Sequence, residues 1–275
     1  MINELYRVLG NQKIYVVAHS PQETPTAVIL LVHGLGEHVR RYDLQFTYFV
    51  QKGYAVLAAD LLGHGRSEGT RGLWNSVQDL YQVIDILMEY GNTIYASIPK
   101  ILYGHSMGAN LAAGYVLQNN HKIKGLILTG AAIRTSKDLP EKIVDRLLKA
   151  PSFIKNITFP NGLDLKYLSL DASIVKSYKV DPLVHNQVSL GAGATILKNA
   201  FDILSNTKNI SVPTLILHGE NDRITYPSGS IALHEKWKNS IYHSWPGMVH
   251  EIHNEPKKVL VWEYILDWIE RIKNE

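Results

Sequence analysis

Ser106 lies at the centre of a segment whose residue types could support nucleophilic chemistry. Residues 104–108, Gly-His-Ser-Met-Gly, fit the pattern Gly-x-Ser-x-Gly. This pattern places a serine at the tip of a sharp strand-to-helix turn, where its hydroxyl faces an open cleft. Glycines on either side keep Cβ atoms out of the turn, and the first amides of the helix point at any oxyanion beside the serine. The segment predicts a nucleophilic serine; a tight turn in another kind of α/β protein is the alternative.

A serine hydroxyl is a weak nucleophile at neutral pH and needs a base within hydrogen-bond reach. His250 lies in the loop between the last expected strand, 240–245, and the last expected helix, 259–272. In α/β-hydrolases, which carry this serine turn, the chain order is serine, acid and then histidine, and this loop carries the base. His250 is therefore the predicted base. His253 is its nearest rival, whereas His218 is expected to pack or to bond a loop.

The acid of such a triad is a buried carboxylate that orients the imidazole and stabilises its charged form. Asp222 comes just beyond the expected strand 213–219 and follows the serine in chain order. Glu220 is close enough to compete for the same role. Asp60 also ends a strand, but it precedes the serine and is expected to tie down its own glycine-rich loop. Asp222 is the predicted acid.

Two backbone amides are needed to stabilise the oxyanion of a tetrahedral intermediate. Met107 follows the nucleophile directly and supplies one of them. The other should come from the loop after the early buried strand, where the residues His-Gly-Leu-Gly at 33–36 bring the amide of Leu35 forward. The glycines of this loop fit a close approach of the backbone, with an ordinary turn as the alternative.

The remaining pattern predicts an α/β fold with a mostly parallel sheet and helices on both faces. Continuous apolar runs indicate strands buried on both faces, and helical spacing separates them. The runs are 27–33, 54–60, 100–105, 125–130 and 213–219, with an antiparallel edge strand at 13–18. Between 134 and 200 strand-like runs vanish and short amphipathic segments lie between prolines. We expect a helical cap at 134–200 inserted into one core domain made of 1–133 and 201–275.

Composition excludes several classes of protein. The chain has 275 residues and a net charge of +3 without a run of basic residues, so it lacks the footprint of a nucleic-acid-binding protein. It has no cysteine, which excludes disulfides, thiolate metal sites and cysteine nucleophiles. The first residues do not resemble a signal peptide, and the longest apolar run, 27–32, is too short to span a membrane. We expect a soluble cytoplasmic protein that needs neither a metal nor an organic cofactor.

Together these motifs resemble those of the monoacylglycerol lipase and lysophospholipase group of α/β-hydrolases. The resemblance rests on segments 33–38, 41–42, 60–69, 104–108 and 250–255. It implies a serine esterase that hydrolyses monoacylglycerol to glycerol and fatty acid through an acyl-enzyme on Ser106. A lysophospholipase, a broad carboxylesterase or a peptidase of the same fold is the nearer alternative. A ligand-binding protein without catalysis is the more distant one.

The resemblance also implies residues that bind the glycerol hydroxyls. Those positions are Glu37, Arg41, Tyr178 and His253, with a surface ion pair as the alternative for Glu37 and Arg41. The cap segment 140–151 carries an apolar stripe flanked by basic residues. This stripe would suit transient contact with a membrane or lipid surface; packing on the body of the protein is the alternative.

Overall fold

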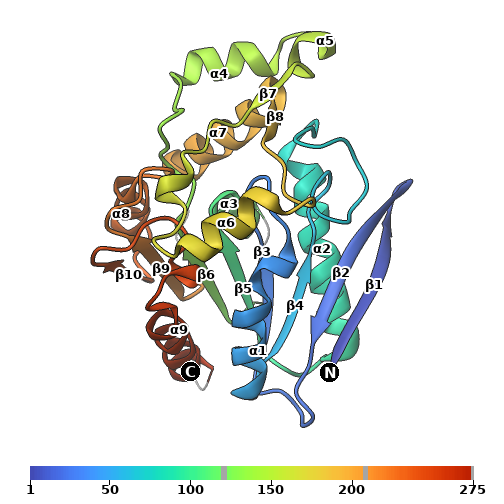
Figure 1. The fold of residues 1–275 in the computed structure, drawn as a ribbon, viewed down its shortest axis with the longest axis vertical. Coiled ribbons are helices and arrows are strands. Elements are labelled where there is room, and N and C mark those ends of the chain that lie inside the picture. The colour runs from blue at the N-terminus through green and yellow to red at the C-terminus, as the bar shows by residue number, and fades with distance from the viewer. Residues whose placement is uncertain (119–122, 207–209, 274–275) are drawn as a thin grey trace.

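The computed structural model describes residues 1–118, 123–206 and 210–273, and over these residues its centre is an eight-stranded sheet (Figure 1). The strand order is β1-β2-β4-β3-β5-β6-β9-β10, antiparallel between β1, β2 and β4 and parallel from β4 to β10. The strands are β1 (Ile2–Leu9), β2 (Gln12–His19), β3 (Val28–Val32), β4 (Ala55–Ala59), β5 (Lys100–His105), β6 (Gly125–Thr129), β9 (Thr214–Gly219) and β10 (Ser240–Trp245). The predicted mostly parallel sheet is confirmed.

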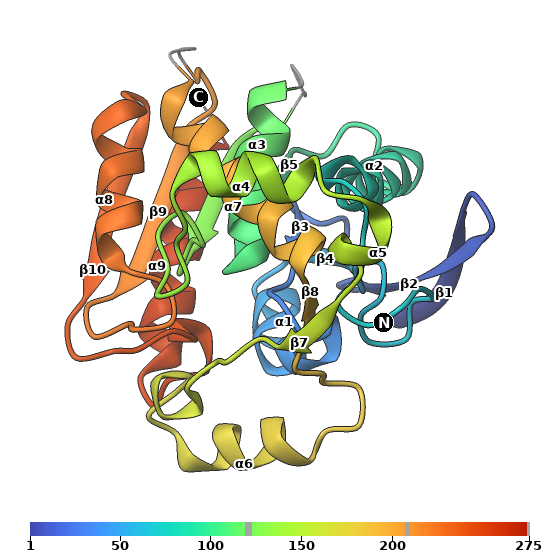
Figure 2. The same cartoon turned by 90° about the horizontal axis from the view of Figure 1, so that it is seen from above.

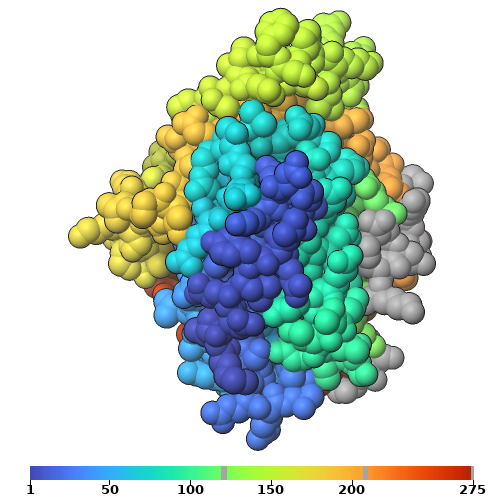
Figure 3. Space-filling view, turned by 90° about the vertical axis from the view of Figure 1, so that its right-hand side faces the viewer, coloured from blue at the N-terminus to red at the C-terminus, as the bar shows by residue number. Residues whose placement is uncertain are grey.

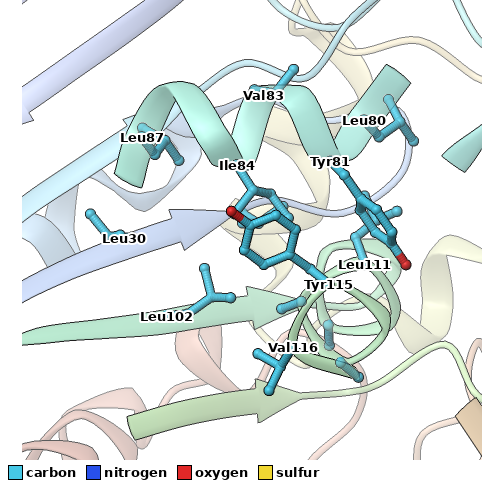
Figure 4. Packing of buried hydrophobic residues seen from close by; sticks show 14 of the residues in the cluster. Leu30, Leu80, Tyr81, Val83, Ile84, Leu87, Leu102, Leu111, Tyr115 and Val116 are labelled. Carbon is cyan, nitrogen blue, oxygen red and sulfur yellow. The ribbon is translucent and has the colours of Figure 1, made fainter. Parts of the chain in front are cut away.

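Helices cover both faces of this sheet, which explains the continuous apolar runs of the inner strands. On one face pack α1 (Asp43–Gln51) and α9 (Lys258–Ile272), which buries Trp262 and Trp268 against the sheet. On the other face pack α2 (Val77–Ile94), α3 (Met107–Gln118) and α8 (Pro227–Lys236). Figure 4 shows the contact between α2, α3 and the sheet, where Ile84 and Leu111 meet Leu30 and Leu102. No described helix is long and apolar enough to cross a membrane.

The N-terminal edge of the sheet differs from the prediction. The expected edge strand 13–18 is β2, and it lies inside the sheet because β1 pairs along its whole length. Figure 3, a space-filling view, shows the N-terminal residues in dark blue on the outside of the molecule. Most β1 side chains are exposed on both faces, so the strand has no apolar alternation from which it could be predicted.

The segment between β6 and β9 forms a cap above the carboxyl ends of the strands (Figures 1 and 2). Its helices are α4 (Glu141–Leu148), α5 (Ser152–Lys155), α6 (Ala172–Val180) and α7 (Leu190–Ser205). Contrary to the expectation that strands vanish here, β7 (Thr158–Pro160) and β8 (Gln187–Ser189) form a short antiparallel ribbon.

Helix α7 passes through the predicted cap boundary at residue 200 and packs on α3. The buried Asn199 amide donates to the side chain of Asn110 (2.8 Å) and accepts from the Tyr81 hydroxyl (2.8 Å). These bonds attach the second half of α7 to the body of the protein. The division into a core domain and a cap domain stays a prediction.

Candidate active site

Ser106 occupies the turn between β5 and α3 in a backbone conformation that is unusual for a serine. Its φ is +56°, and no other described residue except glycine has a positive φ. A Cβ atom on Gly104 would come within 2.3 Å of the Gly108 carbonyl oxygen, and one on Gly108 within 2.1 Å of the Val32 carbonyl oxygen. Both glycines are therefore required where helix α3 begins so close to β3 and β5. The turn presents the serine side chain at the carboxyl edge of the sheet.

The structure brings Ser106, His250 and Asp222 into one hydrogen-bonded series. The Ser106 hydroxyl lies 2.9 Å from His250 Nε2, and His250 Nδ1 lies 2.7 Å from Asp222 Oδ2. An ionised carboxylate only accepts hydrogen bonds, so Nδ1 carries the proton and Nε2 is free to accept the serine proton. The rival acid Glu220 is exposed and accepts a bond from the Gly247 amide instead.

The Asp222 carboxylate is held by more donors than the histidine alone. Its Oδ2 also accepts from Thr225 Oγ1 (2.8 Å) and His218 Nε2 (3.1 Å), and its Oδ1 accepts from the amides of Ile224 and Thr225. Burial opposes the charge, but His250 and these donors hold the pKa of Asp222 well below its ordinary value. His218 thus bonds the acid loop. Thr225 has no feature in the sequence that distinguishes it from other threonines.

The same pair sets the protonation of the histidine. Burial alone would lower the pKa of His250, but the adjacent Asp222 carboxylate raises it above the ordinary value of 6.5. The imidazolium that would form during proton transfer from Ser106 is therefore stabilised by a fixed negative charge. An acid and a base arranged in this way can activate a serine for attack on a carbonyl group.

The amides of Leu35 and Met107 lie beside the cavity at Ser106 and have no hydrogen-bond acceptor among the described residues. Gly34, just before Leu35, donates its own amide to Glu37 Oε1 (2.7 Å). A Cβ atom on Gly34 would lie 3.1 Å from Ser106 Cβ, so the turn can approach the serine only with glycine there. This geometry supports the predicted oxyanion-binding pair.

Glu37 and Arg41 form an ion pair, as the alternative interpretation held, but the pair is buried rather than on the surface. Arg41 Nη1 lies 2.6 Å from Glu37 Oε2, and the two side chains are only 8% and 4% exposed. Arg41 also makes a two-pronged contact with Glu251, at 2.5 and 2.8 Å. The Tyr178 ring packs over the guanidinium at 4.6 Å. Glu251 was not predicted, because its partner Arg41 is distant in sequence.

A cavity of about 610 Å³ extends from Ser106 between the sheet and the cap. Of the predicted glycerol-binding residues, Glu37 and Tyr178 line it, whereas Arg41 and His253 are not among the lining residues. His253 is fully buried, stacked on Tyr42 at 4.5 Å and edge-on to His105. The apolar part of the lining is Leu35, Trp74, Met107, Leu139, Leu147, Phe159, Leu163, Leu168, Val188, Leu190, Ile196, Leu197 and Ile224.

In the described part of the chain no group of three or more His, Asp or Glu side chains could hold a metal ion. A family model described as serine aminopeptidase, S33, matches residues 23–257, which is most of the chain. The chain belongs to this family of serine hydrolases.

The hydrolase is similar in sequence and structure to several other proteins. It is 27% identical over 264 residues to a monoacylglycerol lipase of Mycolicibacterium smegmatis, covering 95% of this chain and 94% of that one. The solved structure of the Paleococcus ferrophilus monoacylglycerol lipase matches with a TM-score of 0.83 at 31% identity, over 93% of this chain and 98% of that one. An uncharacterized abhydrolase domain-containing protein of Dictyostelium discoideum is 32% identical over 260 residues. The alignment covers 93% of this chain but only 27% of that protein.

These similarities confirm the α/β-hydrolase fold and the family resemblance that the motifs predicted. They do not test the roles of individual side chains, which stay predictions.

The backbone of Ser106 gives a prediction about stability. A residue with a Cβ pays roughly 1–2 kcal/mol in the left-handed region, whereas glycine does not. We expect the free energy of unfolding of Ser106→Gly to exceed that of Ser106→Ala by about 1 kcal/mol, because the greater freedom of unfolded glycine offsets part of the gain. Urea denaturation of the two variants measures the difference.

Ser177 is the matched control, because it is an exposed serine inside helix α6. There the order should reverse, with the glycine variant less stable than the alanine variant. The same order at both positions would contradict strain at Ser106.

Proposed function

We propose that the hydrolase cleaves monoacylglycerols to glycerol and free fatty acid through an acyl-enzyme on Ser106. The observation that carries this proposal is the mostly apolar cavity that begins at Ser106 and is lined on its other side by the cap. A monoacylglycerol has one long apolar chain and one small polar end, which suits an apolar cavity with few polar groups. The similarity to two monoacylglycerol lipases supports the same substrate.

In the first step His250 Nε2 accepts the Ser106 proton as Oγ attacks the ester carbonyl carbon. The carbonyl oxygen becomes an oxyanion and accepts hydrogen bonds from the amides of Leu35 and Met107. Asp222 stabilises the imidazolium formed at His250 without taking its proton. As the tetrahedral intermediate collapses, the C–O bond to glycerol breaks and His250 returns the proton to the leaving oxygen.

In the second step water replaces glycerol beside His250. The histidine accepts a proton from this water, whose oxygen attacks the acyl carbonyl carbon. The new oxyanion is held by the same two amides, and its collapse releases the fatty acid as His250 protonates Ser106 Oγ. Each residue thereby returns to its starting protonation state.

The carboxylates of the cavity favour an uncharged alcohol over a peptide amino terminus. A peptide's α-ammonium group would need an unpaired carboxylate near the serine. Glu37 and Glu251 are both bound to Arg41, while Asp164 pairs with Lys166 and Asp138 accepts from Thr135. Of the carboxylates that line this cavity outside the triad, three contact a basic side chain, and Asp138 accepts hydrogen bonds from Thr135.

At the polar end of the cavity, Glu37 and Tyr178 are the side chains that we propose meet the glycerol hydroxyls. Both line the cavity and come from different elements, the turn after β3 and helix α6. Arg41 lies behind them and fixes the Glu37 carboxylate. His253 supports the stack beneath Tyr42, whose hydroxyl donates to Glu37 Oε1 (2.8 Å). We therefore assign Arg41 and His253 an indirect role.

Turnover of a substrate panel tests this function. We expect monooleoylglycerol to be hydrolysed with a higher kcat/KM than lysophosphatidylcholine, a short aryl ester or an aminoacyl anilide. Ser106→Ala should lower turnover at least about 10⁴-fold because the nucleophile is lost, while Ser152→Ala on the exposed face of α5 should not. Retention of activity in Ser106→Ala would contradict the mechanism, and a preference for the lysophospholipid or the anilide would contradict the substrate.

The raised pKa of His250 predicts the pH dependence. The base must be neutral, so kcat/KM should fall as the pH drops through the His250 pKa, with a midpoint above 6.5. Asp222→Asn removes the charge that raises this pKa and should lower kcat about 10⁴-fold. Stopped assays on a water-soluble ester between about pH 5 and 9 measure the profile. A wild-type midpoint below 6.5 would contradict the assigned environment.

We also propose that the cap meets the lipid surface from which substrate is drawn. Phe153 on α5 is 75% exposed and Ile157 is 53% exposed, and Lys149 and Lys155 flank them. Phe159 is exposed on the same segment and also lines the cavity. An apolar tip flanked by lysines suits an anionic lipid surface.

Phe153→Ser tests the membrane contact. It should reduce co-sedimentation with vesicles of phosphatidylcholine and phosphatidylglycerol several-fold, because the exposed ring no longer enters the lipid. Hydrolysis of a short water-soluble ester should stay unchanged. Val180→Ser on α6 is the control, since Val180 is equally exposed (73%) outside this tip. Equal losses of vesicle binding in both variants would contradict a specific role of the α5 tip.

A further inference from the structure

One buried ion cluster joins the two loops that carry the reacting groups. Glu37 and Arg41 belong to the segment after β3 that presents Leu35, and Glu251 follows His250 directly. Glu251 is 2% exposed and contacts Arg41 through both carboxylate oxygens. Loops more than 200 residues apart in the sequence are thus connected through a single guanidinium.

A continuous series of bonds leads from Glu251 to the oxyanion turn. Arg41 Nη1 donates to both Glu251 Oε1 and Glu37 Oε2. The other oxygen of Glu37 accepts from the Gly34 amide (2.7 Å) and the Tyr42 hydroxyl (2.8 Å). The Gly34 and Leu35 amides belong to adjacent peptide planes, so the bond that holds Gly34 restricts the turn that carries the Leu35 N–H.

The cluster needs Glu251 in order to keep this geometry. Burial opposes the charge of Glu251, but Arg41 lowers its pKa, and both oxygens of Glu251 contact the guanidinium. Glu251 is therefore the stable counter-ion of the buried Arg41. Without Glu251, N–H donors of Arg41 would be left unpaired beneath the Tyr178 ring. The guanidinium would then have to turn towards Glu37.

The cap backbone fixes Glu251 from the other side. The amide of Glu251 donates to the Leu168 carbonyl (2.8 Å), and the amide of His250 donates to the Tyr167 carbonyl (3.1 Å). Asn254 Nδ2 donates to Glu251 Oε2 (2.8 Å). The carboxylate is thus held by Asn254 as well as by Arg41, on a backbone bonded to the cap.

We propose that Glu251 is a positioning residue that acts through Arg41 and Glu37 to hold the oxyanion turn in register with His250. The proposal rests on the proposed function of Ser106 as an acyl-transfer nucleophile, but not on the identity of the alcohol. The oxyanion exists only in the transition state and the intermediates. Misplacing the turn should therefore reduce kcat more than it changes KM.

Glu251 also affects the pKa of His250 and therefore the pH dependence of kcat/KM. Its negative charge, with that of Glu37, adds to the effect of Asp222 in raising the His250 pKa. The titratable and charged groups packed around His250 are Asp222, His218, Glu37, Arg41, His105, Glu251 and His253. Removing one negative charge lowers the His250 pKa and moves the acid limb of kcat/KM to lower pH. Water entering a loosened loop would relieve the effect of burial and move the limb to higher pH.

The test compares Glu251→Gln and Glu251→Leu with wild type on a short aryl ester, after confirming fold by thermal unfolding. We expect kcat to fall about 10-fold in the glutamine variant, which keeps one acceptor for Arg41, and about 100-fold or more in the leucine variant. KM should change less than about threefold, because the contact with the oxyanion forms only in the transition state. The Ki of a trifluoromethyl ketone, which forms an oxyanion on Ser106, should rise in parallel with the loss in kcat. Glu251→Gln should also shift the acid limb to lower pH.

Glu255→Gln is the matched control in the same loop. Glu255 is buried as well, but it accepts from the amides of Leu170 and Val249 and does not contact Arg41. Its variant should leave the acid limb and the ketone Ki unchanged. If Glu251→Leu does not fold, the glutamine variant alone decides through its acid limb and Ki. Unchanged kcat and Ki in Glu251→Gln, or an acid limb shifted to higher pH, would overturn the proposal.

A fluorophosphonate probe separates this outcome from failure of the proposed function. Labelling of Ser106 and turnover of the aryl ester in wild type show an active acyl-transfer nucleophile whatever its natural alcohol. The Glu251 comparison then stands even if monoacylglycerol is a poor substrate. Absence of both signals in wild type would refute the mechanism on which the proposal rests.

Discussion

The tight turn at Ser106 is the constraint on which the rest of the site depends. A serine held at φ +56° between β5 and α3 leaves no space for side chains at Gly104, which faces the start of α3, or at Gly108, which faces the end of β3. This closeness fixes Ser106 relative to the end of β3, and therefore relative to the turn that carries Leu35. The strain is local, and the packing of α3 against the buried sheet offsets it.

The buried charged groups around that turn each have more than one hydrogen-bonding partner. Asp222 is bonded by two imidazoles, one hydroxyl and two amides, so its position does not depend on His250 alone. Arg41 lies between two carboxylates, one from the loop after β3 and one from the loop after β10. The charged groups are buried, so their attraction and their desolvation are both large, and breaking either cluster costs more than forming it returns.

Much of this could be predicted from sequence, because the relevant signals are local. The inner strands are continuous apolar runs, and a serine, an acid and a histidine in the right order at strand ends leave few arrangements on a parallel sheet. Strand β1 escaped prediction because both its faces are exposed. The pairing of Arg41 with Glu251, and the exclusion of Arg41 and His253 from the cavity lining, depend on side-chain packing between distant segments, which no local pattern encodes.

The cap divides into a part bound to the catalytic loops and a part that is not. Residues 167–168 bond the loop of His250, and His185 donates its amide to the Gly36 carbonyl (2.8 Å), so the segment around α6 bridges the base and the oxyanion turn. Moving that segment would disturb both. The tip formed by α5 carries the exposed Phe153 and has no such bonds to the catalytic loops among the described residues. The alignment of the base with the oxyanion turn is therefore supported from the α6 side of the cap, by the bonds of Tyr167, Leu168 and His185.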